Sequence, residues 1–247
     1  MEDLVAEKQN ISISEEEQFK EFRRMKRLEE AAANVAKLEC DCLSPNVDKM
    51  SLKELCRTAN SLKLGGIVVR PSVVKACVAF LGKDPQASLI AAVSCPDGGE
   101  TTEVKALAVK RAIKDGVDET EVCAPTFFIK EGNFAYLKKE CKKLARVSRS
   151  RALRIVLDCS VLREQEVLKA ASTIADTGVN CIRLNGADGE LVSKVKAAVK
   201  GKCLIKCDGG DTLSAFVNLT VMGADSVSAK SACELANLLL KQAEGEV

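Results

Sequence analysis

The stretch Val179–Gly210 opens with Val-Asn-Cys-Ile-Arg-Leu-Asn-Gly and closes with Cys-Leu-Ile-Lys-Cys-Asp-Gly-Gly, with a lysine-rich segment between them. Each end piece has the length and apolar character of a buried strand and runs into a glycine turn, whereas the middle is typical of a helix. Consecutive strands joined by a helix pair in parallel. Each strand carries one basic residue just before its turn, Arg183 in the first and Lys206 in the second.

The same alternation recurs along the chain and gives eight β/α units. Eight parallel units can close into a barrel without a free edge. Glycine stands at three joints between helix and strand, Gly116, Gly178 and Gly223, where a left-handed residue would end the helix. We therefore predict a (β/α)8 TIM barrel over residues 38–247, preceded by a helical extension over residues 1–37, with no linker. The expected strands are Leu38–Leu43, Gly66–Val69, Ser88–Val93, Val117–Cys123, Leu153–Leu157, Cys181–Leu184, Cys203–Cys207 and Ser226–Ser228. The expected helices begin near Ser51, Ser72, Thr102, Gly132, Arg163, Gly189, Thr212 and Ser231.

The N-terminal extension is strongly helical from Ser14 to about Lys37 and opens on a capping-box pattern. Phe19, Phe22 and Met25 recur at helical spacing and form one apolar face. We expect this face to pack across the end of the barrel. A helix that binds a partner is the alternative.

Composition restricts the classes of function. The chain has 247 residues with a formal net charge of +2, so no global field favours nucleic acid or a membrane surface. No apolar run approaches the roughly 18 residues of a membrane span, and the first ten residues are too polar for a secretory signal. We expect a cytoplasmic protein. The basic run Arg146–Arg154 has no interleaved aromatic residue, which favours a solvated loop over an anion-binding or nucleic-acid patch.

Twelve cysteines and no histidine define which chemistry is available. Without histidine, nucleophiles activated by a Ser-His or Cys-His pair are excluded. The cysteines are scattered singly through apolar runs, so we expect a reducing compartment, no zinc or other metal site and no cofactor. Cys123, Cys159 and Cys207 are interpreted as residues that fill space at strand ends, with a reactive thiol as the alternative.

Several motifs, in order, resemble those of class I deoxyribose-phosphate aldolases. The segment Cys95–Lys105 is similar to the family's FPLGATTTEVK, and Asp118–Glu121 to its DEVD. Lys130–Gly132 is similar to its KSG, and Ile205–Gly210 to its VKASGG. The resemblance covers Leu38 to about Ala232 and implies the barrel fold inferred above.

The resemblance also implies roles for individual residues. The family's nucleophilic lysine, in VKTSTG, falls on Arg183, and a guanidinium stays protonated and cannot form a Schiff base. The second lysine, which lowers the pKa of the first, falls on Lys206. The proton-relay aspartate falls on Glu121, one methylene longer. The family's C-terminal tyrosine has no counterpart in the ending Lys-Gln-Ala-Glu-Gly-Glu-Val.

At the expected phosphate site the family's glycines fall on Gly209 and Gly210, but its arginine is absent and Asp208 and Asp211 flank the pair. Two carboxylates there should oppose a dianion. Some anion affinity is still expected from Lys230, which falls where the family has a phosphate-contacting serine, and from the nearby Ser228. Arg70 is a further anion-binding candidate, because it replaces the asparagine of the family's VCVNP. The first strand likewise loses the lysine of TLLKP.

These substitutions predict a catalytically inactive or strongly impaired relative that binds a protein partner or an anionic ligand. The alternative is a diverged aldolase or lyase that acts on a phosphorylated sugar, such as 2-deoxyribose 5-phosphate, with Lys206 as the Schiff-base amine and Arg183 as the cation beside it. Glu121 has two readings, a proton relay or a structural ion pair with Arg183 or Lys206. A cytoskeletal partner is suggested only by analogy with glycolytic aldolases. A monomer or a homodimer is expected.

Overall fold

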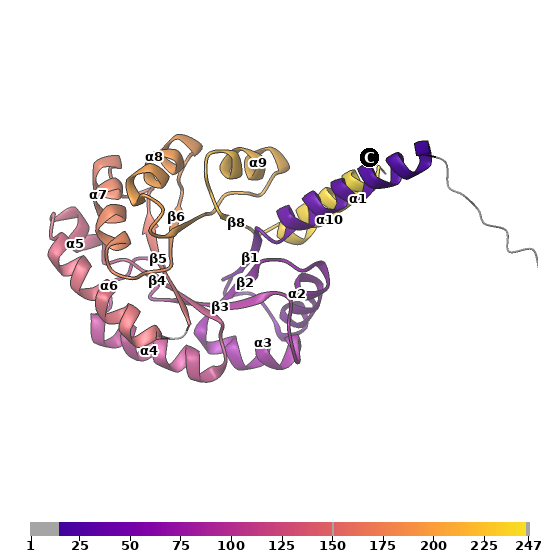
Figure 1. Cartoon of the computed structure of the whole chain (residues 1–247). Coiled ribbons are helices and arrows are strands. Elements are labelled where there is room, and N and C mark those ends of the chain that lie inside the picture. The colour runs from indigo at the N-terminus through magenta and orange to yellow at the C-terminus, as the bar shows by residue number, and fades with distance from the viewer. Residues whose placement is uncertain (1–14, 150, 246–247) are drawn as a thin grey trace, which may run out of the picture.

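The computed structural model describes residues 15–149 and 151–245. Within them, eight parallel strands alternate with helices and close into one barrel, in sequence order from β1 to β8 (Figure 1). The predicted fold is confirmed. The strands are β1 (Leu38–Cys42), β2 (Gly66–Val69), β3 (Ser88–Val93), β4 (Glu119–Cys123), β5 (Ala152–Asp158), β6 (Cys181–Asn185), β7 (Leu204–Cys207) and β8 (Ser226–Ala229).

Each crossover contains a helix, and the helices form the outer wall (Figure 1). After the N-terminal helix α1 (Glu15–Val35), these are α2 (Lys49–Leu62), the short 3-10 turn η1 (Pro71–Val73), α3 (Val74–Leu81), α4 (Thr102–Asp115), α5 (Thr126–Lys130), α6 (Phe134–Ser148), α7 (Glu164–Ala175), α8 (Gly189–Val199), α9 (Leu213–Val221) and α10 (Ala232–Glu244). The sequence prediction missed α5, a single helical turn between β4 and α6.

Glycine ends helices where the sequence indicates it. Gly116 caps α4 with a φ of 109°, and Gly223 lies between α9 and β8 with a φ of 113°. Such positive values are strained for residues with a side chain. The chain can therefore turn directly from helix into strand at both joints.

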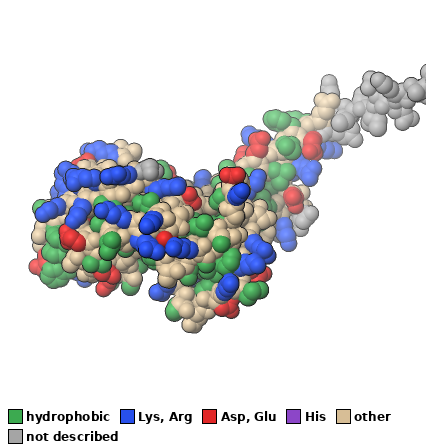
Figure 2. All heavy atoms as spheres, turned by 90° about the horizontal axis from the view of Figure 1, so that it is seen from below, with side chains coloured by type: hydrophobic (Ala, Val, Ile, Leu, Met, Phe, Trp, Pro, Cys, Tyr) green, Lys and Arg blue, Asp and Glu red, His purple; other side chains and the backbone are tan. Residues whose placement is uncertain are grey.

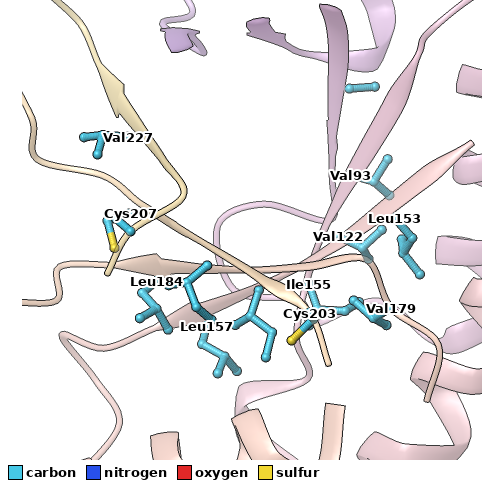
Figure 3. Close-up of a cluster of buried hydrophobic side chains, with 14 of the residues drawn as sticks. Val93, Val122, Leu153, Ile155, Leu157, Val179, Leu184, Cys203, Cys207 and Val227 are labelled. Carbon is cyan, nitrogen blue, oxygen red and sulfur yellow. The ribbon is translucent and has the colours of Figure 1, made fainter. Parts of the chain in front are cut away.

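The main apolar core lies between the outer faces of the strands and the helices. Figure 3 shows part of it, where Leu157 and Leu184 lie together and Val93 and Val122 come from neighbouring strands. Side chains alternate between the two faces of a strand, so the intervening residues point into the barrel. A small separate apolar cluster in the interior is formed by Val68 from β2 and by Ile90 and Ala92 from β3.

Helix α1 packs against α10, and the two form an arm that projects from the barrel (Figure 1). Val35, near the end of α1, is buried, whereas Phe19, Phe22 and Met25 are exposed. The expected packing of the apolar face is therefore confined to the part of α1 nearest the barrel. The capping residue proposed for this helix, Ser14, lies outside the described residues.

Charged side chains are spread over the surface. Lys and Arg are scattered across the face in Figure 2, with Asp and Glu among them, as expected for a net charge of +2. No helix in the described part of the chain is long and apolar enough to cross a membrane.

Candidate functional site

An ion-pair network fills the barrel interior where Arg183 and Lys206 meet. The two residues are direct neighbours in the register of β6 and β7. Both are buried, and Lys206 has no exposed surface. Their side chains converge on Glu121 from β4, whose carboxylate accepts from Lys206 Nζ at 2.6 Å and from an Arg183 terminal nitrogen at 2.8 Å. The structure thus brings the three predicted catalytic residues together.

Strand β1 supplies further carboxylates to this network. Glu39 lies 2.6 Å from Lys206 Nζ, so the ammonium is held between two carboxylates, those of Glu39 and Glu121. Asp41 accepts two hydrogen bonds from Arg183, at 2.5 and 3.1 Å. The residue pair Glu39 and Asp41 has the two-residue spacing that places both side chains on the inner face of β1.

Arg154 on β5 completes the network. One of its terminal nitrogens donates to both oxygens of Glu39 at 2.8 Å, and its Nε donates to Glu119 at 2.7 Å. The prediction that Arg146–Arg154 forms a solvated loop was wrong for this residue and for Arg146, which lies on α6. Arg154 is buried because it lies within β5, which begins at Ala152. The even-numbered residues of this strand, Arg154 among them, face the barrel interior.

The network places three cations, Lys206, Arg183 and Arg154, among four carboxylates, so each cation has at least two anionic partners. Buried ions are tolerated when each has partners of the opposite sign. Burial by itself raises the pKa of Glu121, but the charges of Lys206, Arg183 and Arg154 outweigh it and lower that pKa to about 2. Burial by itself lowers the pKa of Arg183, but the carboxylates of Glu121 and Asp41 outweigh it and raise that pKa above its ordinary value. These groups are therefore ionised in the folded protein.

The contacts of Arg183 leave its guanidinium fully engaged. Besides Glu121 and Asp41, its Nε donates to Asn185 at 2.7 Å. Ser228 from β8 is also buried here and donates to Asp41 at 3.1 Å. Ser228 therefore supports the ion pair of Arg183 with Asp41.

Carboxylates of the chain itself occupy the predicted anion site. Asp211 accepts from the backbone amides of Lys230 and Ser231, at 2.8 and 3.5 Å, next to the start of α10. Asp208 accepts from the amide of Gly186 at 2.8 Å. Backbone amides at such turns and helix ends are the groups that bind phosphate. Here these amides already have anionic partners.

The two glycines of the same loop have distinct roles. Gly209 has a φ of 87°, which a residue with a side chain rarely adopts. Gly210 is buried, and a Cβ added to it would lie 2.3 Å from Val227 Cγ1. The pair is therefore required for the path of the chain as well as for any ligand. The Lys230 side chain is exposed.

Arg70 lies apart from the ion-pair network. The sequence prediction had placed it in one anion-binding group with residues of β8 and of the Gly209–Gly210 loop, but it lies at a different place in the barrel mouth. It lines a cavity of about 590 Å³ together with residues from the carboxyl ends of β1 and β3 and from α4. Its Nε donates to the carbonyl of Leu43 at 2.8 Å, which fixes the guanidinium at the rim. Leu43, Ala92 and Val93 give the cavity an apolar wall, and Glu100 places a carboxylate in it.

Proteins of known name are similar to this chain in sequence and in fold. A deoxyribose-phosphate aldolase of Clostridium botulinum is 26% identical over 200 residues, which cover 78% of this chain and 94% of the relative. This chain is a sequence relative of the deoxyribose-phosphate aldolases. The aldolase of that name from Caldanaerobacter subterraneus is 24% identical over 234 residues, 90% of this chain and 100% of its own length.

The comparison with solved structures agrees on the fold. The structure of an aldolase named QR15 superposes with a TM-score of 0.79 at 22% identity, over 84% of this chain and 96% of that one. No family model matches the chain. The resemblance to deoxyribose-phosphate aldolases inferred from the motifs is thus confirmed.

Proposed function

We propose that this protein is an aldolase-like barrel that does not use Schiff-base chemistry and acts by binding a small anionic ligand. The observation that carries the proposal is Arg183. The motif resemblance aligns Arg183 with the family's nucleophilic lysine, and a guanidinium has no neutral amine with which to attack an aldehyde. Its contacts with Glu121 and Asp41 further fix it as a cation.

The burial of Lys206 supports the same conclusion. A Schiff-base amine must be neutral and must reach a carbonyl carbon. Lys206 is instead fully buried and lies between the carboxylates of Glu39 and Glu121, both 2.6 Å from Nζ. A substrate would have to displace at least one of these partners, and separating a buried ion pair costs roughly 3–5 kcal/mol.

The binding role rests on Arg70. Asp211 already occupies the amides of Lys230 and Ser231 beside the predicted phosphate site, and Asp208 occupies the amide of Gly186, so a ligand gains little there. The cavity of about 590 Å³ beside Arg70 has the size of a small-molecule site. Its apolar wall and its one cation, Arg70, fit a compact ligand with one carboxylate or phosphate group, held at the Arg70 end of a cavity that also contains the Glu100 carboxylate.

One observation favours the alternative, an aldolase with Lys206 as the amine. Arg183 is the direct register neighbour of Lys206, and a fixed cation beside an amine is the arrangement that activates a Schiff-base lysine. In this alternative the roles of the family's two basic residues are exchanged.

Borohydride trapping tests both functions. The full chain is incubated with 2-deoxyribose 5-phosphate, and separately with acetaldehyde, reduced with borohydride and weighed intact by mass spectrometry. We expect no adduct from a folded sample. A stoichiometric adduct that vanishes in Lys206→Ala would overturn the proposal and establish the alternative.

The binding role is tested separately by calorimetry. Wild-type protein and Arg70→Ala are titrated with inorganic phosphate and with 2-deoxyribose 5-phosphate. Binding that weakens by tenfold or more in Arg70→Ala supports the site at Arg70. Equal affinity in the two proteins, or no binding to either, contradicts it. Arg151→Ala, which removes another exposed arginine outside the cavity, is the matched control.

A further inference from the structure

Two cysteines from neighbouring strands meet at the barrel mouth. Cys123 is the last residue of β4, and Cys95 lies two residues beyond the end of β3. The strands pair so that Val93 faces Val122. The two sulfur atoms lie 2.7 Å apart. All twelve cysteines are free thiols in the structure.

The loop that carries Cys95 is held tightly against the end of β4. A Cβ added to Gly98 would lie 2.1 Å from the carbonyl oxygen of Ala124, the residue after Cys123. The Gly98 amide also donates to the carbonyl of Ser94 at 2.9 Å. Only a glycine allows this close approach, and it fixes Cys95 over Cys123.

The two thiols differ in access and in acidity. Cys95 is exposed and lines the cavity of about 590 Å³, whereas Cys123 is 3% exposed. The contact with Cys123 lowers the pKa of Cys95, while the same contact and burial raise the pKa of Cys123. Because a thiolate is the reactive form of cysteine, Cys95 is the nucleophile of the pair and Cys123 the resolving thiol.

We propose that Cys95 and Cys123 form a reversible dithiol–disulfide site, oxidised by hydrogen peroxide that reaches Cys95 through the cavity and reduced again by exchange with a thiol. The Cys95 thiolate attacks one peroxide oxygen, the O–O bond breaks, and with one proton the products are Cys95 sulfenic acid and water. The Cys123 sulfur then attacks the sulfenic sulfur, the S–O bond breaks, and a second water leaves with the Cys123 proton. Two thiols lose two electrons and hydrogen peroxide gains them.

The geometry favours this reaction over oxidation elsewhere. A disulfide bond is about 2.05 Å long, so the two sulfurs need to approach by less than about 1 Å. Two other cysteine pairs contact one another, Cys56 with Cys77 and Cys40 with Cys233. Cys56, Cys77 and Cys40 are buried and Cys233 is partly buried, whereas Cys95 is exposed, so peroxide reaches Cys95 more readily than either of these pairs. The product would tie the 94–101 loop to the strand that carries Glu121.

Peptide mapping of the full chain tests the proposal. Reduced protein is treated with stoichiometric hydrogen peroxide, denatured, alkylated with N-ethylmaleimide and cut with trypsin. Cleavage after lysine places Cys95 alone in the peptide 84–105 and Cys123 alone in the peptide 115–130. We expect these two peptides to appear as one cross-linked species, and ten of the twelve cysteines to be alkylated. A thiol reductant should restore all twelve.

Variants distinguish this site from other cysteine pairs. Cys95→Ser should lose the cross-link, and Cys123→Ser should accumulate a Cys95 sulfenic acid that dimedone traps. Cys77→Ser is the matched control and should retain the cross-link. The proposal is overturned if the peptides 84–105 and 115–130 stay separate while Cys95 is oxidised, or if another cysteine pair is linked first. Circular dichroism confirms that each variant is folded.

Discussion

Replacement of Glu121 by glutamine should destabilise the protein strongly. Glu121 neutralises Lys206 and Arg183 and also lies 3.4 Å from Arg154. Its pKa falls from 4.5 to about 2 on folding, and this shift of about 2.5 units corresponds to about 3 kcal/mol at 1.36 kcal/mol per unit. Removal of one partner from a buried pair costs a similar roughly 3–5 kcal/mol. We therefore expect Glu121→Gln to lower the free energy of unfolding by about 3–5 kcal/mol.

Guanidinium chloride denaturation followed by circular dichroism measures this loss. With a slope of ~5 kcal/mol per molar denaturant, the midpoint should fall by about 0.6–1 M. Glu190→Gln is the matched control, because Glu190 is 74% exposed and pairs with Lys194 at the surface. That variant should change the stability by less than ~0.5 kcal/mol. If Glu121→Gln is as stable as Glu190→Gln, the network does not hold the barrel interior as described.

Three further predictions follow from the same contacts. Because the pKa of Glu121 is lower in the folded state, its contribution to stability is present above about pH 4.5 and is lost as the pH falls towards 2; acid unfolding curves should therefore be shallower over this range for Glu121→Gln than for wild type. The double variant Asp208→Ala, Asp211→Ala frees the backbone amides of Gly186, Lys230 and Ser231 and should gain at least tenfold in phosphate affinity by calorimetry; unchanged affinity would show that these amides are not anion sites. Gly210→Ala forces a Cβ within 2.3 Å of Val227 and should lower the free energy of unfolding by roughly 1–3 kcal/mol, whereas a midpoint equal to wild type would mean that the loop moves aside freely.

Local patterns were sufficient to predict the barrel. β2 and β3 have the bounds that the sequence indicated, and the remaining expected strands differ from the observed ones by one or two residues at their ends. The reason is that each strand is a short apolar run between turn residues, and the glycine joints such as Gly116 mark helix ends. Helix α5 was missed because a single turn is too short to show helical periodicity.

The candidate site was predictable only in part. Arg183, Lys206 and Glu121 stand in motifs, so the resemblance identified them. Glu39 and Arg154 stand in no motif, and their partners are distant in sequence. A charged residue within an apolar run is the one local signal for both, and at Arg154 the neighbouring basic residues obscured it. Only closure of the sheet brings β1, β4, β5, β6 and β7 around the same interior space.

The site at Cys95 was missed for a different reason. Cys123 was interpreted as a residue that fills space, with a reactive thiol as the alternative, because no histidine is present to activate it. In the sequence, Cys95 and Cys123 are separated by 28 positions. The contact depends on the register of β3 with β4 and on the close approach at Gly98, and neither is visible in a local pattern.

The arm formed by α1 and α10 has a consequence for how the barrel stays closed. The ring of strands meets itself at one seam, where β1 pairs with β8. Helix α1 leads into the first strand and α10 leaves the last one, and the two helices hold each other beyond the seam, with a hydrogen bond from Arg27 to the carbonyl of Ala243. Helices α1 and α10 therefore hold the two sides of the seam together. Cutting the arm away would leave β1 and β8 joined by their own backbone ladder and by side-chain contacts such as the hydrogen bond from Ser228 to Asp41, and the seam would become the place where the barrel first opens.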